Sequence, residues 1–343
     1  MRGALIGCGF FAQNHLNAWR DLRVEGVDLV AVCDSDEGKA RMAAAEFGIP
    51  RVYADARAML QAEVLDFVDI ATRMQSHREL VELASERGVN VIVQKPLAPD
   101  WSEAVAIVEA VRSNGVRLAV HENFRFQAPM TKVKASLAAG AIGRPTWARI
   151  AFRTGFDVYA NQPYFRQEKR LAILDVGVHV LDLARFFLGD VERISCEAQR
   201  RNPKNLGEDT ATMLLRHLSG AVSVVECTYE ARIDPDPFPE TLLALEGDRG
   251  SISLGPCLTA RFTHDGVART EHLGSPLLSW TSQPFHTVQE SVLNTQRSII
   301  DAWRAGREAD TNGHDNLKTF ALVEAAYEAA RTARSVVPQA GGA

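Results

Sequence analysis

The chain has 343 residues, of which 46% are hydrophobic and 24% are charged, and its formal net charge is -5. This length favours two domains over one hydrophobic core, and the small negative charge argues against nucleic acid or an anionic membrane as a partner. No apolar run approaches a membrane span. The first expected strand begins too close to Met1 for a signal peptide, so we expect a cytoplasmic protein.

The first residues have the order of a dinucleotide-binding unit. An apolar run ends at Ile6 and is followed directly by Gly7-Cys8-Gly9-Phe10-Phe11-Ala12. A polar stretch compatible with a helix comes next, and a second apolar run, 29–33, stops at Asp34. This succession of strand, glycine-rich turn, helix, strand and acidic residue is typical of the βαβ unit that binds NAD or a related dinucleotide.

The residue types in this motif are the ones that dinucleotide binding requires. Gly7 permits the tight turn, Gly9 lets main-chain N–H groups approach a pyrophosphate, and the small Ala12 allows close packing of helix on strand. Asp34 can accept hydrogen bonds from an adenosine ribose and would repel a 2′-phosphate, which predicts NAD as the cofactor. The expected cofactor-binding residues here are Gly7, Gly9, Phe10, Phe11 and Asp34.

The first third of the chain alternates apolar strands with helical patterns. Strands are expected at 4–6, 29–33, 67–70, 89–93 and 116–120. Helices are expected near 36–46, 76–87 and 100–113, with Asp36 and Asp100 as N-caps. Continuous apolar strands that alternate with helices indicate a parallel, doubly wound sheet. We therefore expect an α/β NAD-binding Rossmann domain over residues 1–121.

From residue 122 the pattern changes to that of an α+β domain. Helices are expected at 127–138 and 173–188, separated by a strand at 146–154 and an aromatic, polar loop. Strands joined by short turns then indicate a mostly antiparallel sheet. They are expected at 191–200, 209–217, 221–230, 241–247, 250–254, 258–263 and 267–273, before closing helices near 286–305 and 313–333. Residues 122–343 are expected to bind the substrate and to mediate oligomerisation.

Polar residues follow the carboxyl ends of the expected parallel strands, where ligands bind in such sheets. Thr72, Gln75 and His77 follow strand 67–70 and are candidates for cofactor contacts, although Ser76 in the same stretch can simply cap the next helix. Gln94-Lys95-Pro96 follows strand 89–93. The position before proline is restricted to extended conformations, so the direction of Lys95 is set, and its ammonium can orient a hydroxyl or share its proton.

Two further clusters carry candidate chemistry. Asn123 and Arg125 follow the fifth strand and are candidates for substrate or nicotinamide contacts, but Arg125 could equally form a structural salt bridge. Asp175, His179 and Asp182 share one helical face, where an aspartate can orient an imidazole that accepts a hydroxyl proton. The alternative is a core histidine whose hydrogen bonds are satisfied, with an aspartate that caps the helix. The nine histidines show no ligand-like spacing, so no metal is predicted.

Taken in this order and spacing, the motifs resemble the glucose–fructose oxidoreductase, inositol dehydrogenase and rhizopine catabolism (Gfo/Idh/MocA) family. The resemblance implies a Rossmann domain, a second domain with an open antiparallel sheet, and a catalytic set that meets at the nicotinamide: Lys95, Asp175 and His179. It also implies that Phe165-Arg166 is the aromatic–arginine pair beside the nicotinamide, which makes Arg166 a cofactor-binding residue. Gln94, also expected at the cofactor, stands where the family usually has Glu, and Arg73 stands where Pro is common.

The resemblance implies an NAD-dependent dehydrogenase that oxidises a small sugar, an aldose at its anomeric carbon to the lactone, with His179 or Lys95 as proton acceptor. The stretch 4–21 is similar to sugar dehydrogenases of this family and makes D-apiose the specific substrate expected. An inositol or polyol dehydrogenase is one alternative, an enzyme that retains and recycles its NAD is a second, and an NAD-binding regulator without turnover is a third. The expected substrate-binding residues are Lys95, Asn123, Arg125, Asp175 and His179. An open sheet would expose an apolar face, so self-association is expected.

Overall fold

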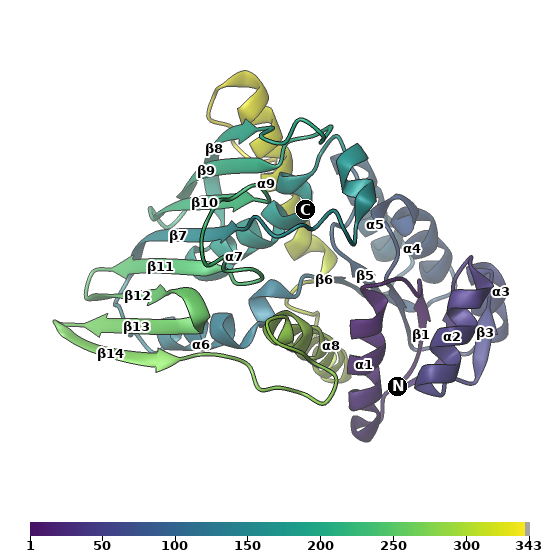
Figure 1. Ribbon diagram of the computed structural model, residues 1–343. Coiled ribbons are helices and arrows are strands. Elements are labelled where there is room, and N and C mark those ends of the chain that lie inside the picture. Colours follow the sequence, from purple (N-terminus) through teal and green to yellow (C-terminus); the bar gives the residue numbers. More distant parts are fainter. Residues whose placement is uncertain (340–343) are drawn as a thin grey trace. The chain divides into compact units, whose positions relative to one another are not determined.

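A computed structural model describes residues 1–339 (Figure 1). The chain divides into two compact units: Met1–Asn123 with Gln289–Leu317, and Phe124–Val288 with the described residues from Lys318 onward. The first break lies close to the expected boundary at 121/122. The return of 289–317 to the first unit was not expected, and it follows from main-chain pairing, because the N–H of Val120 donates to the carbonyl of Thr311 (2.8 Å).

The first unit contains a six-stranded sheet with the order β3-β2-β1-β4-β5-β6, in which every strand pair is parallel. This is the strand order of a dinucleotide-binding Rossmann fold, as expected. The apolar runs form its buried centre. The strands are β1 (Arg2–Ile6), β2 (Asp28–Cys33), β3 (Arg51–Tyr53), β4 (Phe67–Ile70), β5 (Asn90–Gln94) and β6 (Leu118–His121).

The helices of this unit begin close to the residues that the sequence indicates. The side chains of Asp36 and Asp100 cap α2 and α5 by accepting main-chain N–H hydrogen bonds, whereas Ser76 makes no capping bond. The short elements β3 and α3 were not expected, because a strand of three residues, one exposed and two half-exposed, carries almost no periodic signal. The helices are α1 (Ala12–Leu22), α2 (Glu37–Phe47), α3 (Ala56–Ala62), α4 (His77–Ser85) and α5 (Trp101–Ser113), with α8 (His286–Arg304) returning late in the chain.

The second unit contains an eight-stranded sheet with the order β14-β13-β12-β11-β7-β10-β9-β8. The pair β7–β10 is parallel, and the other pairs among the described strands are antiparallel, so the expected mostly antiparallel sheet is confirmed. The strands are β7 (Pro145–Arg153), β8 (Val191–Gln199), β9 (Thr210–His217), β10 (Val222–Thr228), β11 (Leu242–Gly247), β12 (Gly250–Leu254), β13 (Thr259–His264) and β14 (Val267–His272).

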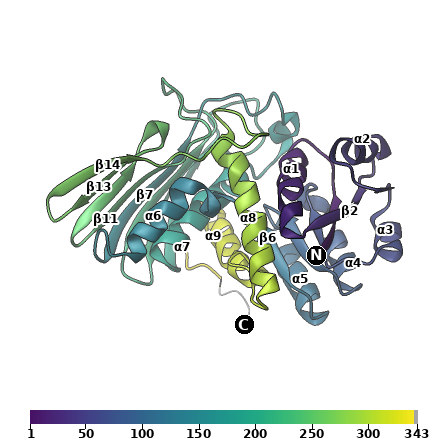
Figure 2. The same cartoon turned by 90° about the horizontal axis from the view of Figure 1, so that it is seen from below.

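One face of this sheet is covered by helices and the other is open. The helices α6 (Ala128–Ala138) and α7 (Val178–Leu188) lie against the same face in both ribbon views (Figures 1 and 2). Buried and exposed residues alternate along β9, which is the signature of a strand with one packed face. The remaining helix, α9 (Gly313–Thr332), closes the chain.

The expected helix over 173–188 has a widened first turn. Residues Ile173–Gly177 form a π-helical turn that leads into α7, and such turns occur frequently at functional sites. A Cβ on Gly177 would lie 3.1 Å from the carbonyl oxygen of Ala172, so the widened turn is suited to glycine. The carboxylate of Glu208 accepts the N–H groups of Leu171 and Ile173 (3.1 and 3.0 Å) and anchors the start of this helix.

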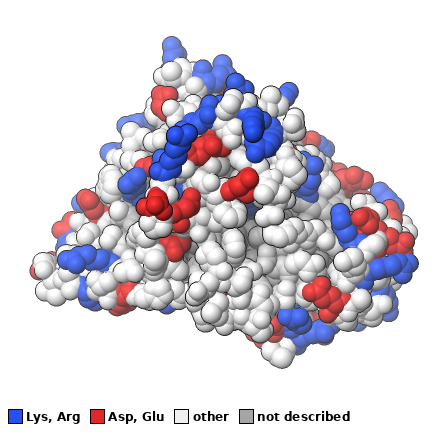
Figure 3. Space-filling view, viewed as in Figure 1, with Lys and Arg blue, Asp and Glu red and all other residues white. Residues whose placement is uncertain are grey.

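The surface carries charges of both signs. Basic and acidic side chains occur together on the face drawn in Figure 3, as the small net charge leads one to expect. Among the helices of residues 1–339, none combines the length and the apolar character needed to cross a bilayer.

Candidate active site

The glycine-rich turn of the first unit contains a glycine, Gly7, with a positive φ, and it is braced by the carboxylate of Asp34. Gly7 has φ +95, and a Cβ there would lie 2.8 Å from the carbonyl oxygen of Ala71. The Asp34 carboxylate accepts the N–H groups of Cys8 (2.7 Å) and Asp36 (2.8 Å). The structure shows a role of Asp34 that the sequence did not indicate, since this carboxylate holds the turn in shape, and its contact with the ribose stays a prediction.

The surface of this turn is open to a ligand. A Cβ built on Gly9 meets no atom within 4 Å, and the side chain of Phe10 is 74% exposed, while Phe11 is partly exposed. Open main chain, a half-exposed Asp34 carboxylate and a helix that starts at Ala12 are what a dinucleotide requires. The residues present therefore fit NAD, with the pyrophosphate over the turn and the adenosine ribose at Asp34.

The stretch after β4 is tied to the stretch after β5 through His77. The imidazole is fully buried, and its two ring nitrogens lie 3.0 Å from the carbonyl oxygen of Leu97 and 3.2 Å from that of Thr72. Burial lowers the pKa of His77, which favours a neutral ring. A neutral ring has a single N–H and can donate to only one of these two carbonyl oxygens. A contact between His77 and the cofactor stays a prediction.

The neighbouring candidates in this stretch remain accessible. The hydroxyl of Thr72 accepts a hydrogen bond from Ser76 (2.8 Å) and is half-exposed, and Gln75 is exposed. Contacts of Thr72 and Gln75 with the cofactor stay predictions. Ser76 also donates to the carbonyl of Arg73 (3.0 Å), so its hydroxyl braces the loop rather than capping α4.

Gln94 lies at the end of β5 with its carboxamide directed inward. Its Oε1 accepts the main-chain N–H of Lys95 (2.7 Å), and its Nε2 lies 2.9 Å from Nε2 of His15. The residue is 7% exposed, and its side chain braces the Lys95 main chain. A contact between Gln94 and the cofactor stays a prediction. Lys95 itself is half-exposed at the strand end. His15 and Asp69, which complete this arrangement, were not singled out from the sequence.

Asn123 and Arg125 have different surroundings. The amide of Asn123 is buried and donates to the hydroxyl of Ser291 (2.7 Å) in the first unit. In the second unit, the guanidinium of Arg125 forms a two-point ion pair with Asp182, and Asp182 also accepts the hydroxyl of Thr319 (2.9 Å). The salt-bridge alternative for Arg125 is the one that the structure contains, and a substrate contact by Asn123 or Arg125 stays a prediction.

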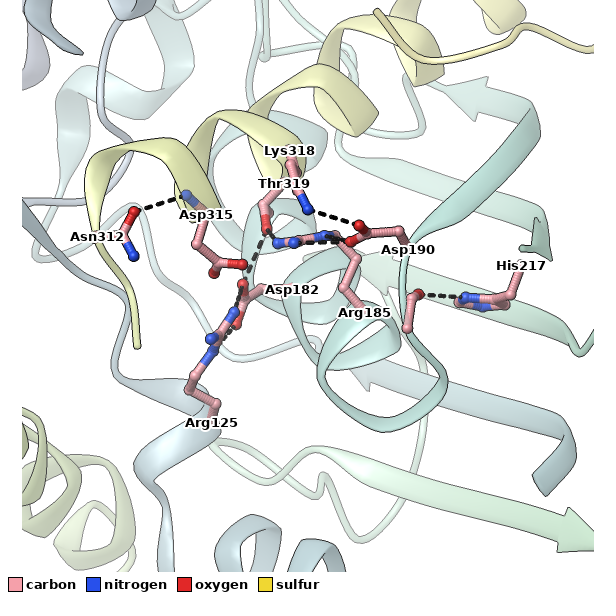
Figure 4. A network of polar contacts seen from close by, with 10 residues as sticks. Arg125, Asp182, Arg185, Asp190, His217, Asn312, Asp315, Lys318 and Thr319 are labelled. Carbon is pink, nitrogen blue, oxygen red and sulfur yellow. Dashed lines mark hydrogen bonds and ion pairs between the residues drawn. The ribbon is translucent and has the colours of Figure 1, made fainter. Parts of the chain in front are cut away.

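The Arg125–Asp182 pair belongs to a larger ionic network, which Figure 4 shows. Arg185 on α7 donates to Asp190 (3.0 Å) and to Thr319 (2.8 Å), and Lys318 donates to Asp190 (2.7 Å). Together these contacts fasten α7 to the start of the second-unit part of α9. Helix α7, which carries His179, is therefore held in place by the contacts of its residues Asp182 and Arg185.

The π-helical turn and α7 present the other two candidates. Asp175 accepts the phenolic hydroxyl of Tyr229, and the imidazole of His179 lies flat on the ring of Phe124. Burial and the neighbouring Asp175 carboxylate raise the pKa of Tyr229 well above its ordinary value, so this phenol remains a donor. Tyr229 was missed from the sequence because it lies 54 residues after Asp175, and only the strand pairing brings them together.

The loop before the π-helical turn contains Phe165-Arg166, and here the arginine stacks on a different aromatic residue, Tyr159. The guanidinium of Arg166 lies over the ring of Tyr159, with its carbon 4.1 Å from the ring centroid. The Tyr159 hydroxyl donates to Glu230 (3.1 Å) and accepts from Asn205 (2.6 Å). Arg166 is thus stacked on an anchored aromatic ring, and its contact with a nicotinamide stays a prediction.

Two family profiles match this chain. Residues 1–122 match the oxidoreductase family with an NAD-binding Rossmann fold, and residues 130–253 match the GFO/IDH/MocA C-terminal domain. The two matches together span most of both units.

Individual relatives match over nearly the whole length. A D-apiose dehydrogenase of Rhizobium rhizogenes is 47% identical over 98% of this chain and 97% of the relative. One of Paraburkholderia graminis is 48% identical over 98% of this chain and 89% of the relative. A solved oxidoreductase from Agrobacterium radiobacter, in complex with NAD+, L-tartaric acid and magnesium, has a TM-score of 0.96 and 47% identity over 98% of both chains.

Proposed function

Because the chain belongs to the Gfo/Idh/MocA family of oxidoreductases and has its NAD-binding Rossmann domain, we propose that it oxidises a small sugar, D-apiose, at the anomeric carbon. The observation that carries the choice of sugar is the 47–48% identity, over 98% of the chain, to two relatives named D-apiose dehydrogenase. The product would be the lactone, formed by loss of a hydride and a hydroxyl proton.

In this proposal Lys95, His179 and Asp175 act on the substrate, and Asp34 and the glycine-rich turn bind the cofactor. The Lys95 ammonium donates a hydrogen bond to the anomeric hydroxyl, and the His179 imidazole removes its proton, which is general base catalysis. Asp175, itself held by Tyr229, orients the imidazole or the sugar. NAD+, when bound, supplies the acceptor for the hydride. Asp34 and the glycine-rich turn hold that cofactor in place.

The test is an initial-rate assay that follows NADH formation with D-apiose, a panel of aldoses and myo-inositol, each with NAD+ and with NADP+. The proposal expects the largest kcat/KM for D-apiose with NAD+, and a lactone product by NMR. A larger value for myo-inositol would replace it with a polyol dehydrogenase. No turnover of any of these compounds, with NAD+ still bound, would favour the non-catalytic regulator. NAD that stays bound through purification and does not exchange would favour the enzyme that recycles its cofactor.

We further propose that copies of the chain associate through the open face of the second sheet. A row of exposed and half-exposed residues crosses that face in register: Ser195, Leu214, Val224, Arg149, Ala244, Ser253 and Arg261. Leu214 is 52% exposed at a mid-strand position, and its partners on the neighbouring strands, Ser195 and Val224, are short side chains that leave it accessible to another copy.

Sedimentation velocity of the full chain tests this second proposal. Leu214→Glu is expected to shift the population toward the monomer. The matched control is Leu218→Glu, which changes a 69% exposed leucine in the turn after β9 and should leave the population unchanged. A monomeric wild-type protein, or equal effects of the two substitutions, would contradict association through this face.

A further inference from the structure

Beneath the glycine-rich turn, three polar side chains form a continuous buried contact. Asp69 on β4 and His15 on α1 are both 0% exposed, and Gln94 at the end of β5 is 7% exposed. His15 Nδ1 lies 2.7 Å from Asp69 Oδ2, and His15 Nε2 lies 2.9 Å from Gln94 Nε2. We refer to Asp69, His15 and Gln94 as the buried polar network. Burying such groups costs free energy unless they are hydrogen-bonded, and here each contacts another member of the network.

The hydrogen positions in this network follow from one obligate donor. The main-chain N–H of Lys95 can only donate, and it points at Gln94 Oε1 (2.7 Å). The other end of the carboxamide is therefore the NH₂ group, which must donate to His15 Nε2. That nitrogen carries no hydrogen, so the proton of the neutral ring is on Nδ1 and is donated to Asp69.

Asp69 is the fixed end of the network. The indole N–H of Trp19, also an obligate donor, reaches the same carboxylate oxygen (2.7 Å). Burial opposes ionisation of Asp69, but the hydrogen bonds that its carboxylate accepts from His15 and from the indole of Trp19 help to hold its pKa below the ordinary value. An anionic Asp69 therefore accepts from His15, His15 accepts from Gln94, and Gln94 accepts from the Lys95 main chain.

We propose that Gln94 is a positioning residue for Lys95, and that Asp69 and His15 hold its carboxamide in the one orientation in which it can accept the Lys95 N–H. The inference rests on the proposed function in one respect, namely that the Lys95 ammonium acts on the substrate hydroxyl. Because Lys95 lies at the end of a strand, a main-chain hydrogen bond at that residue limits the directions its side chain can take. Misplacement by about 1 Å can lower a rate by up to about 100-fold.

A glutamine suits this position because its two ends differ. A carboxylate at position 94 would still accept the Lys95 N–H, but its second oxygen would face the unprotonated His15 Nε2, an acceptor opposite an acceptor. His15 would then have to bind a second proton and lie between two carboxylates. The ring of His121, whose centroid is 4.2 Å from that of His15, also faces this position, and Gln296 lies 3.5 Å from Asp69. With glutamine at position 94, the carboxamide NH₂ donates to His15 Nε2, so His15 does not need to bind a second proton.

The first experiment reads the tautomer directly, without substrate. Nitrogen-15 NMR of histidine-labelled protein, with the His15 signals assigned by their loss in His15→Gln, should show protonated Nδ1 and unprotonated Nε2. In Gln94→Glu, both His15 nitrogens should have imidazolium shifts. A wild-type ring protonated on Nε2 would overturn the proposal. The result does not depend on which sugar is oxidised, so failure of the proposed function is seen separately, as absence of turnover.

The second experiment separates positioning from general stability. Gln94→Leu, which removes the acceptor, should lower kcat by roughly tenfold or more while the KM for the sugar and the dissociation constant for NAD stay unchanged. Gln94→Glu keeps the acceptor and should restore most of kcat. Ser85→Ala removes a hydrogen bond of a buried serine in the same unit, outside the buried polar network, namely the one donated by Asn114 (3.1 Å), and should lower the melting temperature but not kcat. A Gln94→Glu enzyme as slow as Gln94→Leu, or an equal loss in Ser85→Ala, would overturn the proposal.

Discussion

The imidazole of His179 lies parallel to the ring of Phe124, with centroids 3.8 Å apart and planes inclined by 2°. The next residue, Arg125, is bound to Asp182, which follows His179 by one turn of α7. The short helical turn Phe124–Phe126 is thus fastened to α7 at two adjacent points, one by stacking and one by charge. The orientation of the His179 imidazole therefore depends on Phe124, whose side chain has no polar group.

Replacing Phe124 should reduce turnover without removing any polar contact. A stacked pair contributes about 0.5–1.5 kcal/mol beyond its buried area. If that energy holds the imidazole in its reactive orientation, Phe124→Leu should lower kcat by about two- to tenfold. Phe124→Tyr keeps the stacked ring and serves as the control. Steady-state kinetics with the preferred sugar measure both variants, and a wild-type kcat in Phe124→Leu would refute the orienting role.

Removing Asp182 should strongly destabilise the fold. Arg125 and Asp182 side chains are 8% and 1% exposed, so Asp182→Ala leaves a buried guanidinium without its partner, at a cost of about 3–5 kcal/mol. The matched control is Glu328→Ala, which breaks the Arg331–Glu328 pair on the surface (side chains 70% and 46% exposed) and should cost less than about 1 kcal/mol. Urea unfolding measures the free energy of unfolding of both variants. Similar losses of stability in the two would show that burial does not determine how much an ion pair contributes.

Asp34→Ala should weaken NAD binding by two routes. The substitution removes the acceptor for the N–H groups of Cys8 and Asp36, and it removes the carboxylate expected at the ribose. Hydrogen bonds to a charged group are each worth about 1.5–3 kcal/mol, so the KM for NAD+ should rise by about tenfold or more. The KM for NADP+ should rise less, because repulsion of the 2′-phosphate is lost as well. Parallel kinetics with both cofactors test this, and an unchanged ratio of kcat/KM would place Asp34 away from the ribose.

Stability should fall as the solution is acidified below the ordinary pKa of histidine. Burial lowers the pKa of His77 and of His217, whose ring contacts Gly189 and Ser223, from the ordinary value of 6.5. Above pH 6.5 both rings are neutral in the folded and the unfolded chain. Below it the unfolded chain binds protons that the folded chain resists, so the free energy of unfolding decreases toward the lower folded pKa values.

The measurement is the urea midpoint at several values between about pH 7 and about pH 5. His217→Asn should flatten this dependence, because asparagine can hydrogen-bond at the site but does not titrate there. His264→Asn changes a half-exposed histidine and provides the control. An undiminished slope in His217→Asn would assign the acid sensitivity to other groups.

Local pattern determined the architecture of this protein. Apolar runs, glycine turns and aspartate caps specify which residues become strands and helices, because periodicity and backbone conformation are properties of neighbouring residues. The Rossmann sheet, the antiparallel second sheet and the nucleotide turn could be predicted on that basis. The catalytic set Lys95, Asp175 and His179 came from the resemblance to a known family, since the spacing of Asp175 and His179 fits a core histidine equally well, and its role stays a prediction.

Only the tertiary structure decided which partners these residues have. The return of 289–317 to the first sheet, the parallel pairing of β10 with β7 and the Tyr229–Asp175 hydrogen bond join segments distant in sequence. Residue type and spacing suggested cofactor contacts for His77 and Gln94, and only the structure shows which groups inside the fold lie within hydrogen-bond distance of their side chains. The physical reason is that a side chain's hydrogen-bond partners depend on what the packed elements bring within about 3 Å, and chain order does not encode those distances.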